Sequence, residues 1–134
     1  MKTLKAWRFL VPALAAGFIL SACGLRLWME QGKLDERLIK YHDLYRWRNY
    51  EAASSYLLPA VRKDFLAAAE AQHGDLNVAE YEIQHVAIGP SGREATVLVS
   101  RSFFKMPSAT LQQQNLEQRW LLVQGDWYLS GPPY

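Results

Sequence analysis

The segment YEIQHVAIGPSGREATVLVSRSFF, residues 81–104, decides the fold class because apolar and polar residues alternate on both sides of a turn. The apolar residues of its ATVLV stretch are two apart, which is the period of a β-strand with one buried face. The Gly-Pro-Ser-Gly sequence at 89–92 is typical of a tight turn, so the two halves are expected to form an antiparallel hairpin. The first half keeps its apolar residues on one face only if an extra residue bulges near Gln84 or His85.

Two more strands are expected downstream of this hairpin. After a loop at 105–110, a third strand begins at about Leu116 and carries Trp120 on the same face as Leu116. The Gln-Gly-Asp triplet at 124–126 then turns the chain tightly into a fourth strand at 127–130. The second half of the chain therefore predicts a meander of four antiparallel strands.

Upstream of the strands the apolar residues follow a helical period. They recur at spacings of four, three and four residues, as Leu34, Leu38, Tyr41 and Tyr45. Ile39 and Trp47 fall outside this stripe, so either the helix has a second contact or it ends before Trp47. Asn49 can cap a second short helix that runs to about Leu57, and a third helix is expected over residues 60–72.

Three helices followed by four antiparallel strands predict an α+β domain in which the helices cover one face of a bent sheet. The residues also resemble the NTF2-like, or cystatin-like cone, family of small secreted domains. The motifs that carry this resemblance are YEAASSYLLP at 50–59, the I-x-x-V-x-I spacing at 83–88, the A-x-V-x-V strand at 95–99 and the ending WLLVQGDWY at 120–128. The resemblance covers residues 34–130 and leaves 131–134, Gly-Pro-Pro-Tyr, as an extended tail that cannot join a sheet.

The first 22 residues have the composition of a secretory signal peptide. Lys2, Lys5 and Arg8 precede an apolar run at 9–20, which is the order found in signal peptides. A bilayer-spanning helix needs roughly 20 apolar residues, so cleavage is expected rather than permanent spanning.

The apolar run ends in Leu-Ser-Ala-Cys at 20–23, which resembles the lipobox of bacterial lipoproteins. The resemblance implies that signal peptidase II cuts between Ala22 and Cys23, and that Cys23 carries diacylglyceryl and acyl groups such as palmitate. These chains would anchor the mature protein to the membrane. The alternative is a chance cysteine after an ordinary secretory signal. Cys23 is the only cysteine of the chain, so an intramolecular disulfide is excluded.

The residue after Cys23 is Gly24 and not aspartate, and by the same resemblance this predicts the periplasmic face of the outer membrane rather than retention at the inner membrane. Residues 23–33 form the lipidated N-terminus and a short tether. Trp28 and its apolar neighbours could sit among the lipid headgroups. Alternatively, these residues begin the first helix and pack on the domain.

The composition excludes several classes of function. The chain has 134 residues, half of them apolar and 21% charged, which fits one globular domain and excludes disorder or a multidomain enzyme. Its net charge is +2, but the part from Cys23 onward has 12 basic and 13 acidic residues. A nearly neutral body argues against nucleic acid as a partner, because binding to nucleic acid depends on clustered basic residues.

No catalytic motif or metal motif stands out in the sequence. His42, His73 and His85 are too widely spaced to form a metal-binding pattern, so neither a metal nor another cofactor is expected. The Ser-Ser pair at 54–55 and the Ser-Arg-Ser sequence at 100–102 lack the context of a hydrolase nucleophile.

The resemblance implies a cone whose opening lies between the helices and the inner face of the sheet. The candidate lining residues are Tyr41, His42, Tyr81, Arg101, Gln118 and Trp120. Related isomerase-like and cyclase-like enzymes hold a carboxylate base there, whereas Glu82, Glu94 and Glu117 are expected on the outer face here. Arg101 could bind an anionic ligand, or it could lie at the rim, where it is solvated or pairs with Glu117. The aromatic residues Trp120, Trp127 and Tyr128 could line a pocket or simply form the core.

The outer sheet face carries apolar residues where a one-sided sheet should be polar. They are Leu98, Phe104, Leu121 and Val123. This predicts a homodimer or docking onto another envelope protein, against the alternative of scattered surface residues. The function expected from the sequence is therefore a membrane-anchored, non-catalytic binding or interaction module at the cell envelope. A ligand-binding or isomerase-like enzyme that uses the cone, and a structural subunit of an envelope complex, are the alternatives.

Overall fold

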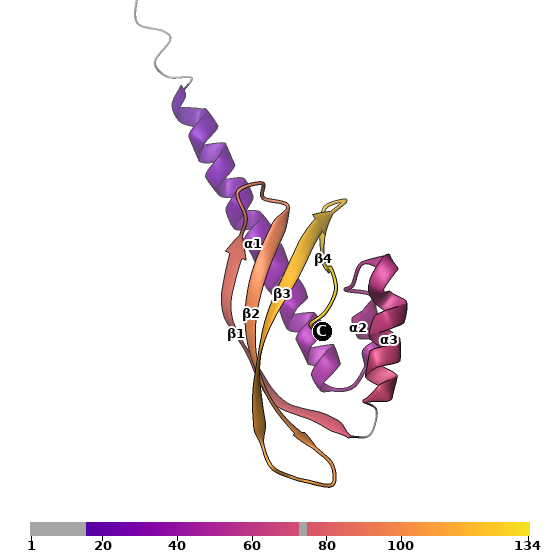
Figure 1. Ribbon diagram of the computed structural model, residues 1–134. Helices are drawn as coiled ribbons and strands as arrows, with labels where there is room; N and C mark the ends of the chain where they lie inside the picture. The colour runs from indigo at the N-terminus through magenta and orange to yellow at the C-terminus, as the bar shows by residue number, and fades with distance from the viewer. Residues whose placement is uncertain (1–15, 73–74) are drawn as a thin grey trace, which may run out of the picture. The chain divides into compact units, whose positions relative to one another are not determined.

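The computed structural model describes the backbone of residues 16–72 and 75–134 and the side chains from residue 24 onward. The chain divides into two compact units, Met1–Gly32 and Lys33–Tyr134. The second unit contains four antiparallel strands and the helices packed on them (Figure 1). The predicted α+β class is confirmed. The predicted signal sequence is largely outside the described residues, as is the side chain of Cys23.

Helix α1, Ala16–Arg46, is longer than the sequence predicted. The segment expected to be a tether, residues 23–33, is helical. Its backbone therefore belongs to the first helix, as one of the two alternatives predicted. From Lys33 onward the predicted stripe from Leu34 to Tyr45 is buried. The helix ends before Trp47, which is 75% exposed, and Arg48 has a positive φ of 61° that terminates the helical path. Among the described residues, no helix is both long and apolar enough to cross a membrane.

Two short helices follow α1. Helix α2, Tyr50–Ser54, is capped as predicted by Asn49, whose side-chain oxygen accepts a hydrogen bond from the Ala52 N–H at 3.3 Å. It ends before Leu57 because the chain there pairs with β4: Leu58 N–H donates to Leu129 O at 3.0 Å. A single 3₁₀ turn, Pro59–Val61, then leads into α3, Arg62–Ala71, where the sequence predicted one helix.

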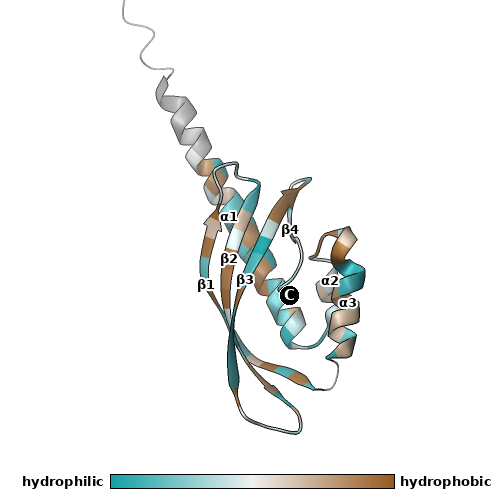
Figure 2. Cartoon of the chain, in the orientation of Figure 1, coloured by the Kyte–Doolittle hydropathy of each residue, from teal (hydrophilic) through white to brown (hydrophobic). Residues whose placement is uncertain are grey.

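The strands are β1 Leu76–Ile88, β2 Glu94–Lys105, β3 Gln112–Val123 and β4 Asp126–Leu129, and they lie side by side in chain order. The predicted bulge in β1 is present as a register shift between Ile83 and His85. A second shift, between Val78 and Glu80, was not predicted. Hydrophobic and hydrophilic residues alternate along the strands (Figure 2).

Strand β3 begins at Gln112, four residues before the predicted start at Leu116. Its first residues are polar and exposed, so they give no apolar pattern, and they belong to the strand because their backbone pairs with β2 as far as Phe103. The predicted tight turn into β4 is present at Gln124 and Gly125, whose φ angles are 52° and 85°. Two successive positive φ values are typical of the hairpin turn that matches strand twist.

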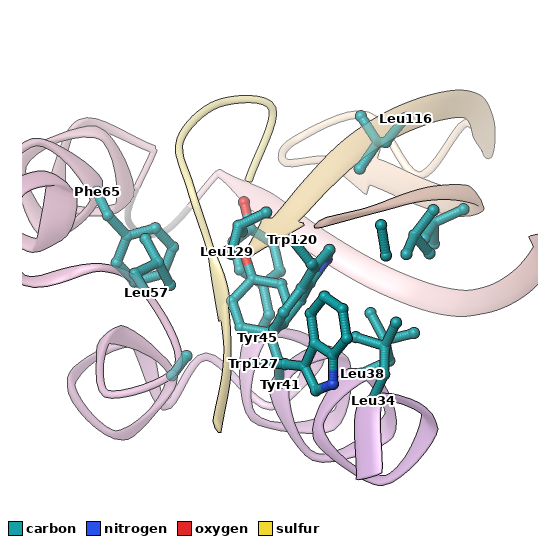
Figure 3. Close-up of a cluster of buried hydrophobic side chains, with 14 of the residues drawn as sticks. Leu34, Leu38, Tyr41, Tyr45, Leu57, Phe65, Leu116, Trp120, Trp127 and Leu129 are labelled. Carbon is teal, nitrogen blue, oxygen red and sulfur yellow. The ribbon is translucent and has the colours of Figure 1, made fainter. Parts of the chain in front are cut away.

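The core lies between the helices and one face of the sheet. Tyr41 from α1 meets Trp120 from β3 with ring centroids 5.7 Å apart, and Trp127 from β4 is buried beside them (Figure 3). Trp120 and Trp127 are therefore core residues and do not line a pocket. The 131–134 segment does not extend away from the domain. It folds back against the core, and the chain end lies beside the helices in Figure 1.

Candidate functional site

A cavity of about 430 Å³ opens between α3, the strands β2 and β3, and the C-terminal segment. Its walls are mostly apolar, while its polar side chains are cations, amides and tyrosines. The lining residues include Phe65, Ala68, Arg101, Lys105, Gln114 and Tyr134. The volume falls within the range of small-molecule sites.

Arg101 is the charged group at this cavity. It follows Ala95, Val97 and Val99 at the two-residue period of β2, so its side chain points to the inner face, and it is only 3% exposed. Its Nη1 donates a hydrogen bond to the main-chain oxygen of Tyr134 at 2.9 Å. Its guanidinium carbon lies 4.3 Å from the centre of the Tyr45 ring, in a cation–π contact.

The second terminal nitrogen of Arg101, Nη2, is buried and has no hydrogen-bond partner. Within the described part of the chain, no Asp or Glu side chain forms an ion pair with Arg101, and the oxygen that its Nη1 binds belongs to the last residue, Tyr134. The alternative of a rim position paired with Glu117 is therefore wrong. A buried guanidinium is costly unless its N–H groups are paired, and here the Tyr134 oxygen and the Tyr45 ring supply the contacts of one part of it.

The C-terminal segment forms one wall of the cavity. The Tyr134 ring meets the Phe65 ring edge-on with centroids 5.1 Å apart. The main-chain oxygen of Pro133 accepts a hydrogen bond from Gln118 Nε2 at 3.3 Å. The chain thus places an aromatic ring against α3 and an oxygen on Arg101.

Behind the cavity lies a buried polar network centred on Gln118. Because the Gln118 amide nitrogen donates to Pro133, its Oε1 is the acceptor for His42 Nε2 at 3.1 Å and for Trp120 Nε1 at 3.4 Å. This arrangement places the proton of the neutral imidazole on Nε2. Burial, reinforced by the charge of Arg101, lowers the pKa of His42 to about 3. His42 is therefore a neutral structural group at ordinary pH.

Tyr41 is also buried, and its hydroxyl has no hydrogen-bond partner. Burial raises the pKa of Tyr41 well above its usual value, although the nearby charge of Arg101 opposes the shift. Tyr41 and Arg101 thus each carry a buried polar atom without a partner in the same region of the core.

Tyr81 is not among the residues that line the cavity. Its hydroxyl donates to Asp43 Oδ1 at 2.7 Å, and its ring stacks on His42 with centroids 5.1 Å apart. Burial, together with this bond to Asp43, raises the pKa of Tyr81 to about 12. It holds α1 against β1 and does not contribute to the cavity wall.

Of the six predicted lining residues, only Arg101 lines the cavity. Tyr41, His42, Gln118 and Trp120 are buried behind it, and Tyr81 lies apart. Sequence reasoning missed Tyr134 and Phe65 as paired walls of the cavity, because it treated the last four residues as a tail outside the domain. The sequence feature that could have indicated this contact is the aromatic residue Tyr134 after two prolines, since a large ring at the chain end can pack on the domain.

The four apolar residues predicted to group on the outer sheet face do not form one patch. Leu98 and Phe104 are six residues apart on β2, about 20 Å along a strand. Leu98 lies between the polar partners His85 and Glu117. Leu121 and Val123 lie toward the other end of the sheet, beyond the Arg119–Glu94 ion pair of 2.6 Å. Self-association or docking through this face stays a prediction.

No three His, Cys, Asp or Glu side chains among residues 24–72 and 75–134 come together in a metal-binding group. His73 lies outside the described residues. Glu82 and Glu117 are exposed, and Glu94 pairs with Arg119 on the outer face.

The sequence matches no protein-family model and no curated protein. Among solved structures, it is similar to an NTF2-like protein with a cystatin-like fold from Novosphingobium aromaticivorans. The TM-score is 0.56 at 15% identity, over 90% of this chain and 88% of that one. The fold is NTF2-like. A SEC-C motif containing protein from Rhodopseudomonas palustris gives a TM-score of 0.57 at 17% identity, over 66% of this chain and 68% of that one. At these identities the likeness extends to the fold alone.

Proposed function

We propose that this protein is a lipid-anchored binding module of the bacterial cell envelope, with the cavity of its NTF2-like domain as the binding site. The observation that carries the proposal is Arg101, a buried guanidinium at the cavity with an N–H group that has no partner. Buried polar groups are normally paired, so an unpaired one needs an explanation, and ligand binding at the cavity is the explanation proposed for Arg101.

Binding rather than catalysis is favoured by the chemistry of the polar groups. Arg101, Lys105 and Gln114 are hydrogen-bond donors, and donors of this kind can hold an anion or a carbonyl group without removing a proton from it. The carboxylates considered at the sequence level, such as Glu82 and Glu117, are exposed on the outer face. His42, held neutral behind the cavity, orients Gln118 and through it the C-terminal segment.

The anchoring part of the proposal is supported by the sequence at 20–23 and by its position after a charged leader and a short apolar run. Four large apolar residues on the helix just after Cys23 are exposed, namely Leu25, Leu27, Trp28 and Met29. Trp28 is 73% exposed, and an indole beside a lipidated residue suits the headgroup region of a membrane.

Cell fractionation tests the anchor. We expect the wild-type protein to be found with the outer membrane, and globomycin, which blocks signal peptidase II, to cause a larger precursor to accumulate. The Cys23→Ala variant should lose membrane attachment or remain as the unprocessed precursor. Unaltered processing under globomycin, together with equal membrane retention of Cys23→Ala, would show that the lipid anchor is absent.

Retention of a native ligand or partner tests the binding role. The protein is extracted from membranes after mild crosslinking, and its adducts are analysed by mass spectrometry. We expect an adduct on the wild-type protein that is reduced in the Ala68→Phe variant, because Ala68 lines the cavity on α3. The Ala67→Phe variant, at an exposed position of the same helix, is the matched control. Identical adducts in both variants would exclude the cavity as the binding site.

A further inference from the structure

The C-terminal segment, residues 131–134, contacts the domain as a bound peptide would. In the described part of the chain, the last hydrogen bond between main-chain groups runs from Ser130 N–H to Arg119 O at 2.9 Å. The two prolines that follow cannot donate one. From there the main chain accepts hydrogen bonds from side chains of the sheet, at the oxygens of Pro133 and Tyr134. The segment is therefore held by the cavity wall and not by strand pairing.

The two donors that hold the segment are positioned by the domain. The Arg101 guanidinium lies against the Tyr45 ring, and Gln118 is fixed by the hydrogen bonds that its Oε1 accepts from His42 and Trp120. Both donors are buried, with 3% and 0% exposure. Without an occupant, Arg101 Nη1 and the Gln118 amide nitrogen would lose their acceptors in a region sheltered from water, which is unfavourable. A preformed pair of donors for two consecutive main-chain oxygens suits an extended peptide.

An aromatic surface completes the site. The centroid of the buried Phe65 ring is 6.2 Å from that of Tyr45 and 6.4 Å from that of Tyr50, so the surface joins all three α-helices. Tyr134 extends it by packing edge-on against Phe65 at 5.1 Å. Aromatic pairs in this geometry are favourable beyond the apolar area that they bury. The site thus contacts two main-chain oxygens with its polar groups and one aromatic side chain with its apolar wall.

The attachment of the segment is weak compared with that of the strands. No main-chain N–H of residues 131–134 donates a hydrogen bond, and Pro132 and Pro133 are exposed. The cavity of about 430 Å³ lies directly against the segment. A segment that is retained by few contacts outside the sheet opens at low cost. It can therefore be exchanged for another peptide without unfolding the sheet.

We propose that residues 131–134 are an intramolecular ligand of the cavity, and that an extended, proline-containing segment with an aromatic side chain from a partner protein binds there in exchange. This inference rests on the proposed function and names the ligand class and the regulation of that site. Arg101 and Gln118 donate to consecutive main-chain oxygens, and Phe65 holds the aromatic ring. The chain's own segment keeps the site closed until a competitor displaces it.

Calorimetric titration of the full-length protein in detergent, and of a variant that lacks residues 131–134, tests the proposal. The probe is the acetylated peptide SGPPY, which copies residues 130–134. We expect the deletion variant to bind the peptide about tenfold or more tightly than the full-length protein, because the tethered segment competes at an effective concentration in the millimolar range. Equal affinities would overturn the proposal, as would the absence of binding to a folded deletion variant at millimolar peptide.

Variants of the peptide and of the domain locate the contacts. A peptide with alanine in place of its tyrosine should bind the deletion variant about fivefold or more weakly, because it lacks the ring that packs on Phe65. Arg101→Gln in the deletion variant should weaken binding about tenfold. Arg119→Gln removes an exposed arginine of the outer face and should leave binding unchanged. Unchanged binding in Arg101→Gln, or equal binding of the two peptides, would overturn the assignment to this site.

The Tyr134→Ala variant of the full-length protein decides the question if the deletion variant fails to fold, which thermal melts show. It keeps the segment but removes the ring contact with Phe65, so it should bind the SGPPY peptide about fivefold or more tightly than the wild type. Equal affinities of Tyr134→Ala and the wild type would then overturn the proposal.

The outcomes separate this inference from the proposed function. Absence of peptide binding, together with a crosslinked adduct that is lost in Ala68→Phe, would overturn the peptide ligand while the cavity remains a binding site. Peptide binding by the deletion variant, without an adduct on the wild-type protein in membranes, would support the intramolecular ligand and contradict the proposed function. The lipid anchor does not affect the titration, because the protein is measured in detergent.

Discussion

Gln118 is the residue on which the buried polar network depends, because its one side-chain amide serves His42, Trp120 and Pro133 together. The period of β3 predicts that Gln118 points inward beside Trp120. Its partners could not be predicted from that period, since they come from a helix 76 positions away and from the C-terminal segment. The inward position of Arg101 follows from the same alternation, whereas its hydrogen bond to Tyr134 is visible only in three dimensions.

We predict that Gln118→Leu and Tyr41→Phe have opposite effects on stability. Gln118→Leu leaves buried donors of His42 and Trp120 without an acceptor, so the free energy of unfolding should fall by about 3 kcal/mol. Tyr41→Phe removes a buried hydroxyl that has no partner, so stability should be unchanged or rise by up to about 1 kcal/mol. Urea denaturation measures both. A loss of more than about 1 kcal/mol in Tyr41→Phe would mean that its hydroxyl is hydrogen bonded.

The pKa of His42 makes stability depend on pH. Because burial lowers this pKa to about 3 from the ordinary 6.5, the unfolded chain binds a proton between these values while the folded domain does not. Stability is therefore present above pH 6.5 and is lost as the pH falls toward 3, with a slope approaching about 1.4 kcal/mol per pH unit.

The His42→Gln variant isolates this effect, since all other titrating groups are retained. Urea denaturation from pH 6.5 down to pH 4 should show a smaller loss of stability in the variant than in the wild type. Parallel pH profiles for the two proteins would contradict a neutral buried His42.

At the scale of secondary structure, the tight turn between β3 and β4 was predictable in place, and the structure gives its φ angles. Gln124 and Gly125 both have positive φ, although glutamine is a poor residue for that conformation. We predict that Gln124→Asn stabilises the domain by about 0.5 kcal/mol, because asparagine tolerates positive φ better. Gly125→Ala should destabilise it by about 1 kcal/mol, since any added Cβ meets no other atoms within 4 Å and only backbone strain remains. Thermal unfolding shifts of the same sign in both variants would refute this assignment.

The elements that could not be located from sequence lack an apolar pattern of their own. The start of β3 is polar on both faces and is specified by its pairing with β2. The end of α2 is specified by the bond from Leu58 to β4, and propensity alone favours a longer helix. Conversely, the bulge near Gln84 was predictable, because without it the apolar residues of β1 would change faces.

At the scale of the whole molecule, the protein combines a compact NTF2-like unit with an N-terminal region whose sequence resembles a lipoprotein signal. The α+β class and the strand order followed from the change of apolar period after residue 74. The lining of the cavity did not follow from the sequence, because the C-terminal segment that forms one of its walls was assigned to a free tail. The charge balance from Cys23 onward fits a domain that binds small ligands or proteins at a membrane rather than nucleic acid.

The anchor at Cys23 is the central claim, since it decides where the cavity operates. The most direct measurement is the intact mass of the protein extracted from membranes, with fragmentation of its N-terminus. We predict a chain that lacks residues 1–22 and carries diacylglyceryl and acyl groups on its first residue, Cys23. A chain that retains residues 1–22, or one that begins at another residue with Cys23 unmodified, would contradict the account.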